Sequence, residues 1–312
     1  MLRSSFLWLS EQRSIFEFIK RNGLARRFAS RFVAGETLDH AMTATRELNA
    51  KDISVSLDLL GESVTTPEEA TGARDAAVAI LDRIQAVGVR ANLSIKLTQM
   101  GLDLDQALAA ANVTAILERA RAHGIFVRID MEASEYVQRT LDLFHTQLLG
   151  AYGDLVGVVI QTMLRRAETD VEALLAARAR VRLVKGAYQE PDSVAFPAKR
   201  DVDATFASLS ERMLERGNYP AFATHDERLI THVKRYARAH DIPAERFEFQ
   251  LLYGVRRDLQ EQLRREGYNV RVYVPYGTEW YPYLMRRLAE RPANVAFMVG
   301  SLARETFGRR AS

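Results

Sequence analysis

Two lysines stand out as groups that could do chemistry. Only six of the 43 basic residues in the chain are lysine, yet Lys96 and Lys185 each end a short run of aliphatic residues. An ammonium at the end of a buried strand is costly unless a carboxylate or an anionic ligand compensates for it. These lysines are therefore candidates for binding an anion or for forming a Schiff base with a carbonyl substrate.

Polar residues also end the neighbouring aliphatic runs. They are Glu62, Asp130, Gln161, Thr224, His225, Gln250 and Tyr273. A single polar residue in such a place is usually a helix cap or part of a loop. Polar groups at the ends of many runs instead indicate one shared site, provided that the fold brings those ends together.

A further group follows the last run. Tyr283, Arg286, Arg287 and Glu290 are spaced i, i+3, i+4 and i+7, which places them on one face of a helix. Guanidinium groups bind carboxylates and phosphates through paired hydrogen bonds. The stripe is therefore a candidate anion clamp, and a solvated helix face is the simpler alternative. The six histidines show no metal-binding spacing, so no metal site is expected.

The elements that must position these residues repeat from residue 52 onward. Eight short β-branched runs are predicted as strands: Ile53–Leu59, Arg90–Lys96, Ile125–Asp130, Leu155–Gln161, Val181–Lys185, Pro220–Thr224, Phe247–Leu251 and Val270–Val274. Between them lie stretches of helical periodicity, including Glu69–Val87, Leu104–His123 and Val202–Gly217. Several of these stretches stop at a glycine: Gly88, Gly124, Gly217 or Gly267.

Strand–helix alternation predicts a parallel sheet, because parallel strands need a helical crossover. Eight units over about 250 residues match the size of a (βα)8 barrel, a fold whose active sites lie at the carboxyl ends of the strands. A doubly wound open sheet is the alternative, but the G-x-G-x-x-G motif of a dinucleotide-binding sheet is absent from the chain. The barrel would gather the strand-end polar groups on one rim.

The charge of the chain is unevenly distributed. The net charge of the 312 residues is +3, but residues 1–35 alone carry +5. We interpret residues 1–48 as an N-terminal helical arm, with helices over 5–20 and 24–34, and residues 49–312 as the barrel. The arm either packs on the barrel or lies on a membrane surface. The rest of the chain is nearly neutral, which argues against nucleic-acid binding. The absence of cysteine fits a reducing cytoplasm.

The strand-end segments together resemble proline dehydrogenases. The resemblance covers roughly residues 50–300 and is carried by L-L-G-E (59–62), L-S-I-K (93–96), I-D-M-E (129–132), V-I-Q (159–161), R-L-V-K-G-A-Y (182–188), A-T-H (223–225), F-Q-L-L-Y-G (249–254), Y-V-P-Y-G (273–277) and Y-L-M-R-R (283–287). The segments R-L-V-K-G-A-Y and Y-L-M-R-R are the most specific to this family. In length the chain is similar to the monofunctional bacterial enzymes.

The resemblance implies a distorted (βα)8 barrel that binds FAD, with a C-terminal helix over the flavin. It implies oxidation of L-proline to Δ1-pyrroline-5-carboxylate and transfer of the electrons to a membrane quinone. The implied substrate-binding residues are Lys96, Leu252, Tyr273, Tyr283, Arg286, Arg287 and Glu62, the last pairing with Arg286 as a gate. The implied flavin-binding residues are Met131, Gln161, Arg182, Lys185, Gly186, Ala187, Thr224 and His225. Asp130 and Arg182 are the implied catalytic residues.

Two other functions remain open at this stage. A barrel lyase of the aldolase type would use Lys96 or Lys185 as its Schiff-base amine. That hypothesis explains the strand-end lysines but not the Tyr283, Arg286 and Arg287 stripe. A non-catalytic module associated with the membrane through its basic arm is the third hypothesis.

Overall fold

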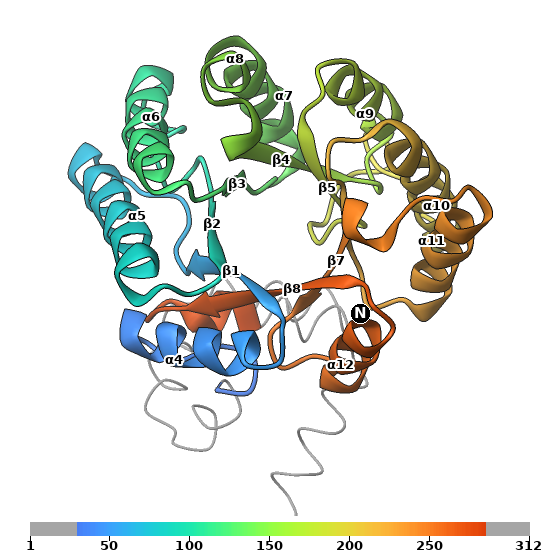
Figure 1. The fold of residues 1–312 in the computed structure, drawn as a ribbon. Helices are drawn as coiled ribbons and strands as arrows, with labels where there is room; N and C mark the ends of the chain where they lie inside the picture. Colours follow the sequence, from blue (N-terminus) through green and yellow to red (C-terminus); the bar gives the residue numbers. More distant parts are fainter. Residues whose placement is uncertain (1–29, 285–312) are drawn as a thin grey trace, which may run out of the picture.

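The computed structural model describes residues 30–284, in which eight parallel strands close into a barrel in chain order (Figure 1). The strands are β1 (Ser54–Leu59), β2 (Ala91–Ile95), β3 (Val127–Ile129), β4 (Val156–Gln161), β5 (Arg180–Val184), β6 (Ala221–Ala223), β7 (Glu248–Leu252) and β8 (Asn269–Tyr276). β1 pairs with both β2 and β8, which closes the sheet. The predicted barrel and all eight predicted strands are confirmed.

Helices surround the barrel, as Figure 1 shows. They are α4 (Leu38–Asn49), α5 (Pro67–Val87), α6 (Gln106–His123), α7 (Ser134–Leu143), α8 (Leu149–Tyr152), α9 (Ala167–Ala176), α10 (Lys199–Arg216), α11 (Glu227–Ala239) and α12 (Arg257–Arg265). A π-helical turn, Phe144–Leu148, joins α7 to α8, and 3-10 turns cover Gly153–Leu155 and Ala244–Arg246. None of the helices in the described part of the chain is long and apolar enough to span a membrane.

Local sequence signals fix the ends of these helices. Thr66 accepts a hydrogen bond from the Glu69 amide at the start of α5, and Pro67 occupies the first turn, where a missing N–H costs nothing. Gly88 ends α5 in the left-handed conformation that glycine adopts without strain. Gly124 ends α6 in the same way, whereas Gly217 ends α10 in extended backbone.

The two faces of the strands differ in polarity. In β3, Val127 and Ile129 are buried among the apolar side chains of the core, while Arg128 between them belongs to the polar set that fills the barrel interior. Interiors of this fold are more often filled by branched apolar side chains. The polar interior therefore indicates that ion pairs and hydrogen bonds, rather than hydrophobic packing alone, hold the strand ends in place.

The joint between β8 and β1 is covered by a helix that precedes the barrel. α4 packs on both strands, so the chain after β8 is not needed there. It turns instead toward the cavity described below: helical residues begin at Trp280, and Tyr283 is buried and lines that cavity. The rest of the predicted C-terminal helix lies outside the described residues, so its place over the flavin remains a prediction.

The described end of the N-terminal arm lies against the end of β8. The Ala34 amide donates to the Pro275 carbonyl at 2.9 Å, and the Gly277 amide donates to the Gly35 carbonyl at 3.0 Å. Residues 30–34 form a turn rather than the end of the predicted helix over 24–34, because their backbone follows the strand end. The predicted helix over 5–20 lies outside the described residues.

Candidate active site

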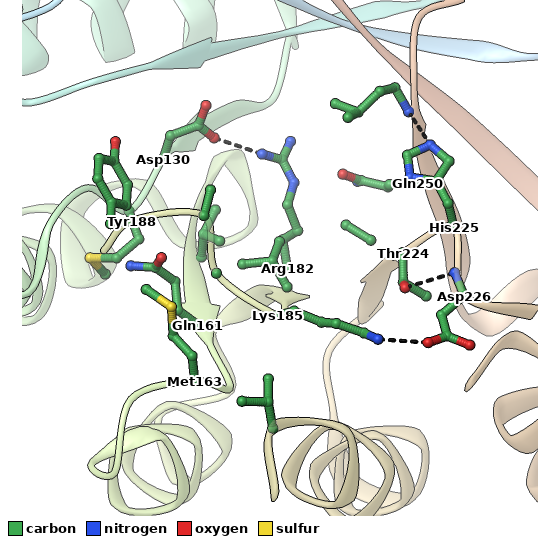
Figure 2. A pocket seen from close by; sticks show the side chains of 18 of the residues that line it. Asp130, Gln161, Met163, Arg182, Lys185, Tyr188, Thr224, His225, Asp226 and Gln250 are labelled. Atoms are coloured by element: carbon green, nitrogen blue, oxygen red, sulfur yellow. Dashed lines mark hydrogen bonds and ion pairs between the residues drawn. The ribbon is translucent and has the colours of Figure 1, made fainter. Parts of the chain in front are cut away.

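The carboxyl ends of the strands surround a cavity of about 1020 Å³. Fourteen of the residues predicted for the site line it: Glu62, Lys96, Asp130, Met131, Gln161, Arg182, Lys185, Gly186, Ala187, Thr224, His225, Leu252, Tyr273 and Tyr283. The remaining two, Arg286 and Arg287, lie outside the described residues. Figure 2 shows the labelled side chains converging from several strands. The volume is at the upper end of small-molecule pockets, so it is sufficient for a large cofactor.

The first pair of charges at the floor of this cavity joins β1 to β2. The Lys96 ammonium lies 2.7 Å from Oδ1 of Asp58, and the side chains are 10% and 2% exposed. Burial alone would lower the pKa of Lys96, but the carboxylates of Asp58, Asp130 and Glu62 outweigh it and raise the pKa above its ordinary value. Lys96 is therefore held as a cation facing the cavity.

A second group, formed by Asp130, Arg182 and Tyr273, links the ends of β3, β5 and β8. Nη1 of Arg182 donates to Oδ1 of Asp130 at 2.6 Å, and the Tyr273 hydroxyl donates to Oδ2 at 2.7 Å (Figure 2 shows the Arg182 contact). Burial and the nearby carboxylate of Asp130 raise the pKa of Tyr273 well above its ordinary value. Asp130 thus orients an arginine and a protonated tyrosine at the same time, as expected of a positioning carboxylate.

A third group of charges lies at the starts of α10 and α11. The Lys185 ammonium contacts Asp203 at 2.6 Å and Asp226 at 2.7 Å, and Lys199 pairs with both carboxylates as well. Burial alone would raise the pKa of Asp226, but the hydrogen bond and charge of Lys185 lower it from 3.8 to about 2. Asp226 also accepts a hydrogen bond from the Arg228 amide, which caps α11.

This pKa shift predicts a pH-dependent contribution to stability. Because the folded-state pKa of Asp226 is lowered, its stabilisation is present above about pH 4 and is lost as the pH falls toward about 2. Asp226→Asn keeps the helix cap but removes the charge. It should therefore lower the free energy of unfolding by about 1–2 kcal/mol at pH 7, allowing for partial exposure, and by about half of that at pH 3. Thermal unfolding at the two pH values measures the difference.

Asp105→Asn is the control for that comparison. Asp105 caps α6 in the same way but forms no ion pair with any described residue. Its substitution should have a small effect at both pH values. An equal cost of Asp226→Asn at pH 7 and pH 3 would contradict the prediction.

The remaining cavity residues supply backbone shape and hydrogen-bonding groups. Gly186 has a φ of 109° and a Cβ there would lie 2.4 Å from the Met163 sulfur, so no larger residue fits. The Leu252 amide donates to Nε2 of His225 at 3.0 Å, so the proton of the neutral ring sits on Nδ1. Gln161 donates to the Glu132 carbonyl at 2.8 Å, which fixes its amide beside the cavity.

Several residues of the site were not predicted. Asp58 lies inside the first strand, and its signal was an acidic residue in a run of alternating serine and aliphatic residues. Glu132 accepts from the amide and hydroxyl of Thr98, whose hydroxyl in turn accepts from the Ser63 amide, so three loops are tied together. Asp203 and Asp226 stand at helix starts, where acidic residues are common, and no sequence signal distinguishes them.

The arrangement can bind a negatively charged small molecule beside a larger cofactor. Three groups of cations face the cavity, and each is oriented by buried or partly buried carboxylates. No cluster of three metal-ligating side chains occurs among residues 30–284. Nε of Arg182 is buried and has no hydrogen-bond partner within the described structure, which leaves a donor for a bound group.

Comparison with known proteins places this geometry in a family. The model of the proline dehydrogenase family matches residues 41–299. The chain is 42% identical over 305 residues to proline dehydrogenase 1 of Bacillus subtilis, covering 98% of this chain and all of the relative. It is 45% identical over 275 residues to proline dehydrogenase of Deinococcus radiodurans, covering 87% and 88% of the two chains.

A solved structure agrees with these relatives. Proline utilization A of Bdellovibrio bacteriovorus, inactivated by N-propargylglycine, superposes with a TM-score of 0.81 at 25% identity. The match covers 89% of this chain and 34% of the larger protein. With a family match over most of its length and relatives above 40% identity across nearly the whole sequence, the chain belongs to the proline dehydrogenase family.

Proposed function

We propose that this chain binds FAD in the cavity and oxidises L-proline to Δ1-pyrroline-5-carboxylate, with the electrons passing to a membrane quinone. The observation that carries the proposal is the floor of the cavity, where Asp130 holds Arg182 at 2.6 Å in a space large enough for a dinucleotide. The names of the relatives, proline dehydrogenase and proline utilization A, support proline as the substrate.

The described residues fit such a cofactor. Flavin-binding groups would be the backbone at Met131, the side chains of Gln161, Arg182, Lys185, Thr224 and His225, and the backbone at Gly186 and Ala187. When bound, FAD would accept a hydride from the proline ring carbon next to nitrogen and carry additional negative charge once reduced. The Nε of Arg182, which has no partner among the described residues, provides a donor for it.

The chain's own residues would bind and orient proline. Lys96, held as a cation by Asp58, would attract the carboxylate together with Arg286 and Arg287, and Glu62 would pair with Arg286 as a gate. Tyr273, Tyr283 and Leu252 would position the ring by hydrogen bonding and packing. The amine must lose a proton for hydride transfer. That proton would pass to solvent, because the carboxylates of Asp58 and Asp130 are each held by a cation.

The contacts of the two lysines disfavour the Schiff-base alternative. A Schiff-base lysine must be unprotonated to attack a carbonyl, which requires a lowered pKa. The pKa of Lys96 is instead raised by three carboxylates. Lys185 is engaged by two carboxylates, at 2.6 and 2.7 Å, which leaves its amine no open approach to a carbonyl carbon. Both lysines are therefore better suited to binding anions.

The visible absorption spectrum tests the proposed function directly. Purified protein should show bound-flavin absorbance, and anaerobic addition of L-proline should bleach it. A colourless preparation that takes up no added FAD would overturn the cofactor assignment. A yellow preparation whose absorbance is unchanged by L-proline would overturn the substrate assignment. Borohydride trapping of a carbonyl compound on Lys96 or Lys185 would favour the lyase instead.

We propose in addition that the basic arm brings a cytoplasmic enzyme to the inner face of the membrane. The segment 30–35 follows the end of β8, so the chain enters the barrel at the same rim as the cavity. Vesicles containing anionic lipid should therefore float the full chain but not a chain lacking residues 1–29. Equal flotation of the two proteins would contradict a role for the arm.

A further inference from the structure

One buried cation in the barrel interior is not explained by the site as described. Arg128, in β3, is 1% exposed and is among the largest fully buried side chains. Its Nη1 donates to the backbone carbonyls of Val158 and Arg180 at 2.9 and 2.7 Å, and its Nε has no partner. Arg128 forms no ion pair with any residue of the described segment. Leaving a buried guanidinium without a counter-charge is costly.

The other interior cations are paired. Lys96 contacts Asp58 at 2.7 Å, Arg182 contacts Asp130 at 2.6 Å, and Arg271 contacts Glu248 at 2.9 Å. These three cations are each paired with a carboxylate, and a fourth buried carboxylate, Glu132, is hydrogen-bonded to Thr98 rather than to a cation. Because arginine stays protonated in proteins, Arg128 is a buried positive charge that no carboxylate of the described residues contacts.

The backbone is built to admit this side chain. Arg128, Gly157 and Arg180 lie side by side in the registers of β3, β4 and β5. A Cβ at Gly157 would lie 2.7 Å from Nη1 of Arg128 and 2.3 Å from the Arg180 carbonyl. The missing side chain on β4 thus makes room for the guanidinium to cross to β5. The ring of Phe126, 4.7 Å from the guanidinium carbon, provides a further favourable contact.

The position of Arg128 relates this charge to the cavity. It lies two positions before Asp130 on the same strand face, a distance of about 7 Å along the strand. Burial and the nearby guanidiniums of Arg182 and Arg180 lower the pKa of Arg128 well below its ordinary value, while Glu248 and Asp130 offset this only in part. Arg128 is thus electrostatically coupled to the Arg182 and Asp130 pair at the cavity floor.

We propose that Arg128 supplies the positive charge that balances the negative charge of the reduced flavin ring, acting from the layer beneath Arg182. The proposal rests on FAD being the cofactor. Its physical basis is that a low-dielectric interior transmits charge over several ångströms, so an unbalanced cation favours whatever group becomes anionic nearby. A flavin that gains negative charge on reduction would supply the counter-charge that Arg128 lacks among the described residues.

Two substitutions separate charge from hydrogen bonding. Arg128→Gln removes the charge but retains an amide donor on a shorter side chain, while Arg128→Lys retains the charge and an ammonium donor. In the holoenzyme, Arg128→Gln should lower the ratio of reduced to oxidised flavin at a fixed potential about tenfold, which is roughly 30 mV for a two-electron couple. In Arg128→Lys, the ratio of reduced to oxidised flavin should stay close to that of the unsubstituted protein. Spectroscopic titration against a redox dye measures the ratio.

A second readout does not involve the flavin. The apoprotein of Arg128→Gln should unfold at a temperature no lower than that of Arg128→Lys, because it no longer buries an unbalanced charge. Arg180→Gln is the matched control: Arg180 also lacks a carboxylate partner within the described residues, but it is partly exposed, so its charge is screened. That variant should leave the flavin ratio within about twofold of the unsubstituted protein.

The outcomes distinguish this inference from the proposed function. If the protein binds flavin that bleaches with proline, but Arg128→Gln has an unchanged flavin ratio, the inference about Arg128 is wrong and the function stands. If Arg128→Lys lowers the ratio of reduced to oxidised flavin as much as Arg128→Gln does, the side chain acts through its hydrogen-bond geometry and the charge proposal also fails. A protein that binds no flavin overturns the proposed function itself.

Discussion

Lys96→Met is expected to lower the free energy of unfolding by about 3–5 kcal/mol, because it leaves a buried carboxylate without its partner. Asp58 is 1% exposed, and its hydrogen bond and ion pair with Lys96 span 2.7 Å. Burial already raises the pKa of Asp58 against the opposing effect of Lys96. Without the ammonium, the carboxyl group must either take up a proton or remain charged in a site that solvent does not reach. Urea unfolding at pH 7 measures the loss.

A double substitution separates stability from function. Asp58→Asn removes the orphaned charge, so Lys96→Met together with Asp58→Asn should recover most of the lost stability. The double variant should still bind proline poorly, because the cation proposed to attract the carboxylate is absent. Lys51→Met is the control: Lys51 and Glu261 also lie 2.7 Å apart, but their side chains are 56% and 41% exposed. Its cost should stay below about 1 kcal/mol.

Two results would contradict this account. A loss as small as that of Lys51→Met would show that Asp58 is neutral or solvated in the folded protein. A double variant with restored proline oxidation would remove Lys96 from the substrate site. In the second case the Lys96 and Asp58 pair would be a purely structural link between β1 and β2.

The sequence predicted which residues surround the cavity but not which of them pair. Strand–helix alternation is set by local preference and by the need for crossovers, so the barrel and its eight strands could be inferred from periodicity. The strand-end rule then placed Lys96, Asp130 and Lys185 on one rim. Pairing depends on distances across the barrel, and periodicity carries no information about these. For that reason Asp130 was predicted for the site from its strand-end position and Arg182 from the family resemblance, while their 2.6 Å contact was not predicted.

Buried charges were the least predictable part of the site. Asp58 and Arg128 each stand within a strand between two aliphatic residues, and both side chains are buried. A polar residue within a strand is usually interpreted as facing solvent, but a closed barrel has no solvent on its inner face. Only closure of the sheet reveals that these side chains are buried. The Arg286 and Arg287 clamp lies outside the described residues and remains a prediction.

Asp130→Asn is expected to lower kcat/KM for proline about 10²-fold. The carboxylate accepts hydrogen bonds from Arg182 at 2.6 Å and from Tyr273 at 2.7 Å, and a hydrogen bond to a charged group is worth roughly 1.5–3 kcal/mol. An amide cannot accept on both sides, so one partner loses its orientation. Because Arg182 is proposed to contact the flavin and Tyr273 the substrate, both kcat and KM should change. Steady-state kinetics with an artificial electron acceptor measure the two constants.

Asp103→Asn provides a matched control, because the chain holds the same arrangement on its surface. Asp103 accepts from the Tyr136 hydroxyl at 2.8 Å and from Arg139 at 3.2 Å, and its side chain is 36% exposed. Its substitution should leave kcat/KM within about twofold. Tyr273→Phe removes one hydrogen bond to the carboxylate of Asp130 while sparing the ion pair, so a loss of about tenfold, near the lower end of the range for a hydrogen bond to a charged group, is expected. If Asp130→Asn costs no more than Tyr273→Phe, the ion pair with Arg182 contributes nothing to catalysis, and the positioning role assigned to Asp130 is wrong.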